Sequence, residues 1–579
     1  MDTLPNATPS DVTPGKSRAW LKRPAMSEGQ RFLLLAVLIG LFAGLAVVCF
    51  HVAIEFLSWR TLGAAAGASR LGALLSPALG GLVAAFLALR VFPAAAGSGV
   101  NQTKEAIYIS DGYLPFSGVI GKFLACSLSI GAGNPMGPED PSLQMGAGIA
   151  SLLGRLFRLP RANMRLIAAV GAAAGLAAAF NTPIAAVLFV IEEVLAGWRA
   201  GVLGSIVLAS VSAAVVVRWF LGDEPLFRVP AFQLTHPSEL LVYAGIGVIG
   251  GVLSALFVKW VGALRDALGR WPRWTRYLQP GAAGLLVGCA GLWLPAVMGA
   301  GYDSIDAALH NHFAWPTLLA LGVVKMALVL ICFSAGTPGG MFAPTLFIGA
   351  MIGGGIGGLA RLQWPSRISS PDAYVLVGMG TFFAGVFRAP MTSIFMVFEA
   401  TASYVIILPV MIANMVAYLI SLALQRAPFF SLVARHEGVV LPSLEEQREQ
   451  PVRRVEDAMQ PAPVPVVLAR EPLASAMEAI RSRGLDRCLV AKGDGVWSSL
   501  RREDLEVALG GGDGSRTVEQ ALPLAILPRL YPDLTLDAAL EMMGPHAILP
   551  VASRAHPEQL MGTLTLEDVH RAYGIGGQG

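Results

Sequence analysis

One short pattern occurs twice in this chain, about 200 residues apart and inside apolar sequence. The copies begin at Pro141 and Pro344, share a Leu, a Gly and an Ala at the same spacing, and follow glycine-rich stretches. A second repeated pattern, Phe-x-x-Pro, is followed nine residues after its proline by Glu192 or Glu399. Two related halves, each with an apolar segment broken by Gly and Pro at the same place, are typical of transporters and channels. In such proteins the site lies where the broken helices meet.

Composition places the chain in a membrane. It has 579 residues, 54% of them hydrophobic and only 14% charged, with a mean hydropathy of +0.61. Several apolar runs are long enough to cross a hydrocarbon core of roughly 30 Å, and others are shorter and rich in glycine. We therefore expect an α-helical polytopic membrane protein with helices of uneven length, some of which stop midway. Irregular backbone at membrane depth survives only where protein or water covers it.

The terminal regions, the cysteines and the net charge limit which other classes of protein this chain could belong to. The first 28 residues are polar and basic, and no cleavage signature of a signal peptide follows them. This flank and the long polar C-terminal region predict that both termini are cytoplasmic, with the protein in a bacterial-type inner membrane. The five cysteines show no metal or disulfide spacing, so we expect no metal and no disulfide. A net charge of +3 is too small to indicate a nucleic-acid partner.

Apolar periodicity ends near Leu424, and two similar soluble units follow. Each opens with a Val-Glu-x-Ala phrase, at Val455 and at Val518, and each continues as helix, strand and second helix. Alternating strands and helices predict small α/β units. The resulting domain plan comprises an N-terminal cytosolic segment, two membrane halves, a linker and two α/β units: residues 1–28, 29–220, 238–435, 436–454, 455–510 and 516–575.

The tandem α/β region resembles a CBS-domain pair. In its second unit the stretch Gly562–Asp568 is similar to the ribose-contacting phrase of that family, and Thr565 and Asp568 fall at the relevant positions. The resemblance implies an adenine nucleotide as ligand, with no other cofactor expected. In the first unit Arg501 replaces the hydroxyl residue, which argues against a second nucleotide there. A dimerising module without any ligand is the alternative.

The duplication separates structural from functional positions. Glu192 and Glu399 are alike in the two halves, so we interpret both as structural carboxylates bonded to backbone. By contrast, Glu139 corresponds to Phe342, and Glu193 corresponds to Ala400. An ionisable residue in a membrane segment costs at least about 2.5–3.5 kcal/mol, so two unmatched glutamates need a functional reason. Proton handling is the natural one.

Glu139 stands where a helix is expected to begin, because Gly137 and Pro138 break the chain and Pro141 suits a first turn. Phe342 stands at the matching start in the second half. A helix N-terminus offers free N–H groups and about half a positive charge. Two such ends that converge form an anion site without any basic side chain. A carboxylate at that place is itself an anion, so Glu139 can occupy the site and leave it when protonated.

Three motifs in this order resemble the ion-site motifs of the CLC chloride channels and transporters. They are Gly97-Ser98-Gly99-Val100, Gly137-Pro138-Glu139-Asp140-Pro141 and Gly339-Gly340-Met341-Phe342-Ala343-Pro344. The resemblance extends over residues 30–435. It implies a homodimer in the lipid bilayer, in which each subunit has its own anion path. It also implies a two-fold inverted repeat of broken and tilted helices, followed by a cytosolic CBS pair.

The resemblance assigns roles to individual residues. Ser98 would offer its hydroxyl to a central chloride, next to Gly99, and backbone amides near Glu139 and Asp140 and at Met341 and Phe342 would hold an outer one. Glu139 would be the gating glutamate, and Glu193 the internal glutamate that relays protons in exchangers. Lys122 resembles a basic residue that raises the local potential, although its counterpart Lys325 keeps a purely structural role open.

Four departures from the family pattern surround these residues. Pro138 and Asp140 replace the usual Arg and Gly beside the gating glutamate, and Asn101 replaces a proline after the serine motif. Phe430 stands in place of a tyrosine that contacts the central anion, so that site lacks one donor. Asp140 puts a second carboxylate beside the first, and like charges so close predict that Glu139 is protonated more readily than usual. The same negative charge also predicts weaker anion binding.

These observations predict a chloride/proton antiporter and no enzyme activity. The principal alternative is a passive chloride channel of the same fold, gated by voltage or pH, and Glu193 is the residue that favours exchange. An intramembrane enzyme with Glu139 and Asp140 as an acid pair is a further alternative. Nothing nearby resembles a nucleophile in a substrate cleft, which argues against that reading.

Overall fold

The computed structural model describes residues 28–573 except for short gaps: 64–69, 196–199, 224, 230–235, 366–367, 369, 440, 442–452, 462–464, 494, 511–514 and 545. The predicted N-terminal segment up to residue 27 and most of the predicted linker lie outside the described residues. The chain divides into two compact units, Met1–Leu444 and Glu445–Gly579. We call them the membrane unit and the C-terminal unit.

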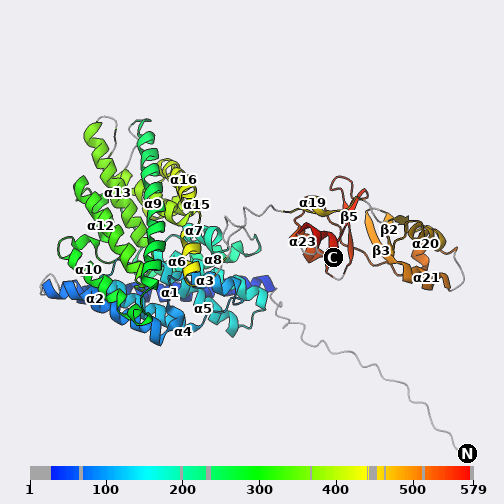
Figure 1. Cartoon of the computed structure of the whole chain (residues 1–579), viewed down its shortest axis with the longest axis horizontal. Helices are drawn as coiled ribbons and strands as arrows, with labels where there is room; N and C mark the ends of the chain where they lie inside the picture. The colour runs from blue at the N-terminus through cyan, green and yellow to red at the C-terminus, as the bar shows by residue number, and fades with distance from the viewer. Residues whose placement is uncertain are drawn as a thin grey trace, which may run out of the picture. The chain divides into compact units, whose positions relative to one another are not determined.

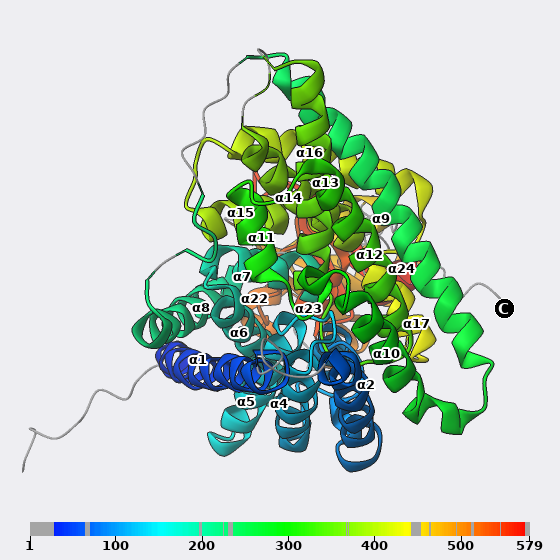
Figure 2. The same ribbon diagram turned by 90° about the vertical axis from the view of Figure 1, so that its left-hand side faces the viewer.

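The membrane unit is helical throughout its described part, and Figures 1 and 2 show its halves as two adjoining groups of helices. The first half contains α1 (Glu28–Thr61), α2 (Arg70–Phe86), η3 (Leu87–Val91), η4 (Pro93–Ala95), α3 (Val100–Tyr108), α4 (Phe116–Gly131), α5 (Glu139–Leu156), α6 (Arg161–Phe180), α7 (Pro183–Phe189), η5 (Val190–Val194) and α8 (Ala200–Leu221). The second half contains α9 (Glu239–Gly269), η6 (Arg273–Tyr277), α10 (Gln279–Gly291), η7 (Pro295–Val297), α11 (Tyr302–Leu309), α12 (Trp315–Ser334), α13 (Phe342–Gln363), α14 (Pro371–Phe387), α15 (Pro390–Thr401) and α16 (Ile407–Leu424), and α17 (Phe429–His436) follows.

Helix lengths differ widely, as the apolar runs predict. Among the described residues, eight helices are long and apolar enough to cross a membrane. Others, such as α3, α7 and α11, are too short to do so. The prediction of helices of uneven length is therefore confirmed.

The same helix pairs pack together in both halves. α1 packs on α8 as α9 packs on α16, and α5 packs on α6 as α13 packs on α14. Glycines allow the close packing of α5 on α6 and of α13 on α14, as small residues do at many helix crossings in membranes. A Cβ on Gly146 would lie 2.2 Å from the Gly171 oxygen, and one on Gly349 would lie 2.3 Å from the Gly378 oxygen. The glycines of the repeated pattern therefore fix how each broken helix sits on the next helix.

The C-terminal unit contains two small sheets flanked by helices. Its elements are α19 (Val455–Ala458), β1 (Val466–Leu468), α20 (Leu473–Arg481), β2 (Arg487–Gly493), β3 (Val496–Arg501), α21 (Arg502–Gly510), α22 (Val518–Ala521), α23 (Leu536–Met543), β4 (Ile548–Ala552), β5 (Leu560–Thr565) and α24 (Leu566–Ala572). β1 pairs in parallel with β2, which pairs antiparallel with β3, and β4 pairs antiparallel with β5. Figure 1 shows the strands between α20 and α21 on one side and α19 and α23 on the other.

The two repeats of this unit exchange their opening segments. The Val455 amide donates to the Leu534 carbonyl at 2.8 Å, and Val455 lies in a core formed largely by the second repeat. Conversely, the Val518 amide donates to the Glu471 carbonyl at 3.0 Å, and Val518 lies in the core of the first repeat. Each Val-Glu-x-Ala phrase is thus a short helix that completes the other repeat.

Candidate functional site

Two glycine loops bring the N-termini of α5 and α13 together. Gly137 and Gly340 exchange a pair of antiparallel backbone hydrogen bonds, with N–O distances of 2.9 and 2.7 Å. Two residues later in each half a helix begins, at Glu139 and at Phe342, as the sequence predicts. The positive ends of two helix dipoles therefore meet inside the unit, where they favour negative charge.

Both acidic side chains at the start of α5 reach the start of α13. The Glu139 Oε2 accepts a hydrogen bond from the Ala343 amide at 3.2 Å, and the Asp140 Oδ2 accepts one from the Met341 amide at 2.7 Å. Neither residue has any exposed surface. The second carboxylate oxygen of each has no partner among the described residues. The carboxylates thus occupy the donors that would otherwise bind an anion. We call this cluster of Met341, Phe342 and Ala343 amides the outer seat.

The serine loop lies against the same helix start. Gly97 and Gly99 have φ angles of +87° and +121°, and a Cβ on Gly99 would lie 2.3 Å from the Asp140 carbonyl oxygen. Between them, the Ser98 hydroxyl is buried and has no hydrogen-bond partner among the described residues. The Gly99 amide donates to the Gln102 side chain at 2.8 Å, so it is already engaged. Ser98 is therefore the polar group of this loop that is available to a ligand.

A cluster of phenylalanine rings surrounds the other side of the seat. The Phe342 ring packs on Phe387 and Phe430, with centroid distances of 4.9 and 6.3 Å, and Phe430 stacks on Phe387 at 5.1 Å. The Asn101 amide group donates to the Phe430 carbonyl at 3.1 Å and so ties α3 to α17. Asn101 and Phe430, both unusual at their positions, thus contact one another.

The family follows from comparison with known proteins. The model of the voltage gated chloride channel family matches residues 80–422. The chain belongs to the voltage-gated chloride channel, or CLC, family. H(+)/Cl(-) exchange transporters named ClcA are 32% identical to this CLC protein in Cronobacter sakazakii, over 72% of this chain and 93% of the relative, and in Vibrio cholerae, over 69% and 88%. A Ralstonia nicotianae protein named as a ClcB-like chloride channel is 33% identical over 67% of this chain and 92% of its own.

Solved structures agree with this assignment. The structure of a slow cyanobacterial Cl−/H+ antiporter is 27% identical to the CLC protein, with a TM-score of 0.65, over 73% of this chain and 99% of that one. A eukaryotic CLC transporter is 22% identical with a TM-score of 0.61, over 93% of this chain and 98% of that one, and shares the fold. The prediction of a CLC-type helical membrane protein is confirmed.

Glu193 forms an ion pair with Lys104, a residue that the sequence did not lead us to expect at the site. The Lys104 Nζ lies 2.8 Å from the Glu193 Oε1, with side-chain exposures of 2% and 14%. Lys104 stands on α3, six residues after Ser98, and Glu193 stands on η5. A charged residue within an otherwise buried face of α3 was the signal that could have identified it.

The two matching lysines make matching contacts. The Lys122 ammonium donates to the Gly97 carbonyl, whereas the Lys325 ammonium donates to the carbonyls of Gly299 and, at 2.9 Å, Val297. Both lysines are fully buried, and each fastens the loop before a short helix, α3 or α11. This shared geometry favours a structural role for both lysines.

Glu192 and Glu399 bind backbone, as the repeat predicts. Glu192 accepts from the amides of Met391 and Thr392 at the start of α15, at 3.2 and 2.9 Å. Glu399 accepts from the amides of Ile184 and Ala185 at the start of α7, at 3.0 and 2.7 Å. Each half therefore caps a helix of the other half.

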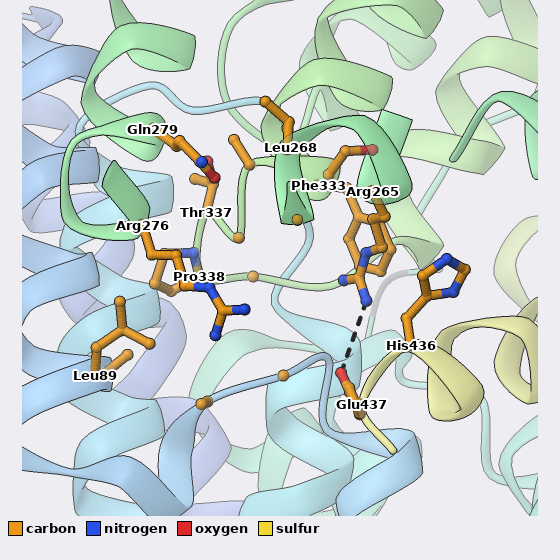
Figure 3. Close-up of a pocket in the computed structure, with 18 of the residues that line it drawn as sticks. Leu89, Arg265, Leu268, Arg276, Gln279, Phe333, Thr337, Pro338, His436 and Glu437 are labelled. Carbon is orange, nitrogen blue, oxygen red and sulfur yellow. Dashed lines mark ion pairs between the residues drawn. The ribbon is translucent and has the colours of Figure 1, made fainter. Parts of the chain in front are cut away.

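A cavity of about 590 Å³ opens between the serine loop and the loop before α13 (Figure 3). Arg265, Arg276, Gln279, Glu437 and Gly97 are among the residues that line it. The Arg265 guanidinium lies 3.9 Å from the Glu437 carboxylate. Burial raises the pKa of the Glu437 carboxyl, and the positive charge of Arg265 opposes that shift.

The predicted nucleotide residues lie together in the C-terminal unit. The Thr565 hydroxyl donates to the Asp568 Oδ2 at 2.6 Å, and the other oxygen of Asp568 accepts from Gln460 at 3.2 Å. The pair also caps α24, since the Asp568 amide donates to the Thr565 hydroxyl at 3.2 Å. Within the described ranges, no group of three or more His, Cys, Asp or Glu side chains could hold a metal ion.

Proposed function

We propose that this CLC protein is a chloride/proton antiporter in which chloride and the Glu139 carboxylate compete for the outer seat. The observation that carries the proposal is the hydrogen bond from the Ala343 amide to the Glu139 Oε2, at 3.2 Å in a fully buried site. A carboxylate that accepts from a helix N-terminus there is the chemical equivalent of a bound anion. Protonation removes its charge, weakens this bond and frees the amide. The names of the ClcA relatives support the same activity.

Chloride would reach the outer seat through the cavity lined by Arg265 and Arg276 and past the Ser98 hydroxyl. The guanidinium groups attract anions toward the cavity. The Ser98 hydroxyl follows Gly97 of the cavity lining and has no partner among the described residues, so it can then donate to the anion. Phe430 contributes no hydroxyl, so Ser98 would be the side-chain donor that holds a central chloride.

Protons would follow a second route through Glu193. Its side chain on η5 is 14% exposed, and it matches Ala400 in the other half, which argues for a function specific to one half. Lys104 neutralises this carboxylate in the structure. A proton that binds the Glu193 carboxylate must therefore displace the Lys104 ammonium from it. An exchanger whose internal glutamate has no such partner would not have this requirement.

The passive channel is the second candidate, and two observations favour it. The Lys104–Glu193 ion pair opposes protonation of Glu193, and the Ralstonia relative bears a channel name. Paired measurement of chloride and proton flux decides between the candidates. For the full chain in liposomes, we expect an imposed chloride gradient to drive protons uphill, and Glu139→Gln to abolish proton movement while chloride still passes. Chloride flux without proton movement from the unmodified protein would establish the channel instead.

We further propose a homodimer with an inverted repeat, located in a bacterial inner membrane with both termini in the cytoplasm. The reciprocal caps of Glu192 and Glu399 support inversion, because each helix start faces the helix end of its counterpart. The C-terminal unit would be a CBS pair that binds an adenine nucleotide at Thr565 and Asp568. A ribose there has to displace the Gln460 amide from Asp568. Titration of ATP into the full chain, compared with Asp568→Ala, tests that ligand.

A further inference from the structure

The outer seat contains two carboxylates, although the proposed exchange requires only one. The amides at the start of α13 belong to Met341, Phe342 and Ala343, because Pro344 has no N–H and the Thr345 amide already donates to the Met341 carbonyl at 3.1 Å. Asp140 accepts from the first amide and Glu139 from the third. Of the three, only the Phe342 amide makes no hydrogen bond to the described residues. An incoming anion therefore finds one free donor.

The glycine loops are shaped around both side chains. A Cβ on Gly137 would lie 2.2 Å from the Glu139 Oε2, and a Cβ on Gly340 would lie 2.8 Å from the Asp140 carboxyl group. No side chain larger than hydrogen fits at either place while the carboxylates hold their positions. The Asp140 contact is also the shorter hydrogen bond, 2.7 Å against 3.2 Å. Asp140 is thus held in the seat at least as firmly as Glu139.

The charged groups around Asp140 come from two helices. Lys122 and Cys126 of α4 are near enough to interact electrostatically with it, and Glu139 adjoins it on α5. α13 brings no ionisable side chain to the seat, since Arg361 in its last turn is its sole charged residue. Lys122 supplies one positive charge, which acts on Asp140 and also on Glu437 outside the seat. The seat therefore carries surplus negative charge until at least one carboxylate binds a proton.

We propose that Asp140 is a second gate, which must leave the Met341 amide before an anion can use the whole outer seat. This inference rests on the proposed passage of chloride past the start of α13. Each carboxylate binds one proton and loses its charge, and the anion then accepts the hydrogen bonds that the Met341 and Ala343 amides had given. Departure of Glu139 alone exposes the Phe342 and Ala343 donors but leaves a carboxylate beside them. Full access thus requires two protons.

The test compares Glu139→Gln with Glu139→Gln/Asp140→Gly and Glu139→Gln/Asp140→Asn in the full chain. Asparagine keeps an acceptor for the Met341 amide and so preserves the fold, whereas glycine frees the amide. Because the freed Met341 amide can then donate a hydrogen bond to the anion, the glycine variant should bind chloride at least about tenfold more tightly at neutral pH, measured by calorimetry. In liposomes, the chloride flux of Glu139→Gln should still rise as the pH falls, and this rise should disappear in both double variants.

Asp372→Asn in the Glu139→Gln background is the matched control, because Asp372 is also a buried aspartate at the second position of a helix, α14. It should leave chloride affinity and the pH profile unchanged. If Asp140 only ties the two halves together, Glu139→Gln will already be independent of pH, and its chloride affinity will not respond to Asp140→Gly; that result overturns the second gate. If the unmodified protein shows no proton coupling, the proposed antiport is wrong. The chloride affinity and the pH profile of the variants still test the role of Asp140 in that case.

Discussion

At the scale of single residues, the buried pair of Lys104 and Glu193 is the most consequential contact outside the outer seat. Two opposite charges that are 2.8 Å apart and almost fully buried stabilise each other only while both are present. Removal of the lysine leaves an uncompensated carboxylate in the helix bundle, and removal of the glutamate leaves an uncompensated ammonium. The pair therefore links any change in Glu193 to the stability of α3, the helix that begins beside Ser98.

Lys104→Met should lower the free energy of unfolding by about 3–5 kcal/mol, because it leaves the Glu193 charge buried without a partner. Lys104→Met/Glu193→Gln should regain most of that loss. Thermal unfolding of the purified variants in detergent measures both effects. Arg502→Met, which breaks the exposed pair with Glu506, is the control and should cost less than about 1 kcal/mol. A Lys104→Met protein as stable as the unmodified one would show that the pair contributes nothing.

At the scale of helices, reciprocal capping joins the halves. Glu192 and Glu399 each accept two amide hydrogen bonds from a helix start in the other half, so neither α7 nor α15 is capped by its own sequence. Two broken helices are thereby held in fixed relation to the outer seat.

We expect Glu192→Ala and Glu399→Ala each to lower the free energy of unfolding by about 1–2 kcal/mol, the usual cost of losing a helix cap. Glutamine at either position keeps one acceptor oxygen and should lose less. Because these residues lie outside the seat, the ratio of chloride to proton flux should stay the same in the variants that remain folded. A changed ratio would mean that the caps take part in coupling; thermal unfolding and paired flux measurements report the two quantities.

The sequence predicted where helices begin better than it predicted which side chains contact one another. The starts at Glu139 and Phe342 followed from local Gly and Pro chemistry, and the roles of Glu192 and Glu399 followed from their repetition. The contact of Asp140 with the Met341 amide spans 201 residues, and no periodicity encodes such a distance. Lys104 escaped notice for a related reason: its charge suggests a solvated side chain until the fold brings Glu193 beside it.

At the scale of the whole molecule, the two units have separate cores. A chain that ends at Leu444 keeps every residue of the outer seat, the serine loop and the cavity. We therefore expect it to fold and to transport chloride in liposomes, and to lose any response that adenine nucleotides cause in the full chain. Failure of the shortened chain to reach the membrane in folded form, judged by size-exclusion chromatography, would show that the C-terminal unit is needed for assembly.

The exchange of Val455 and Val518 also orders events during synthesis. When the first repeat leaves the ribosome, the core that receives its opening helix has not yet been translated, and the slot that this repeat offers to Val518 is still empty. The core of the first repeat can close soon after Val518 has been made, whereas the helix at Val455 has no complete core to join until the chain has been made through β5 and α24. A premature stop in the last few dozen codons would therefore leave the Val455 helix without its core, while the core that holds Val518 keeps all of its residues.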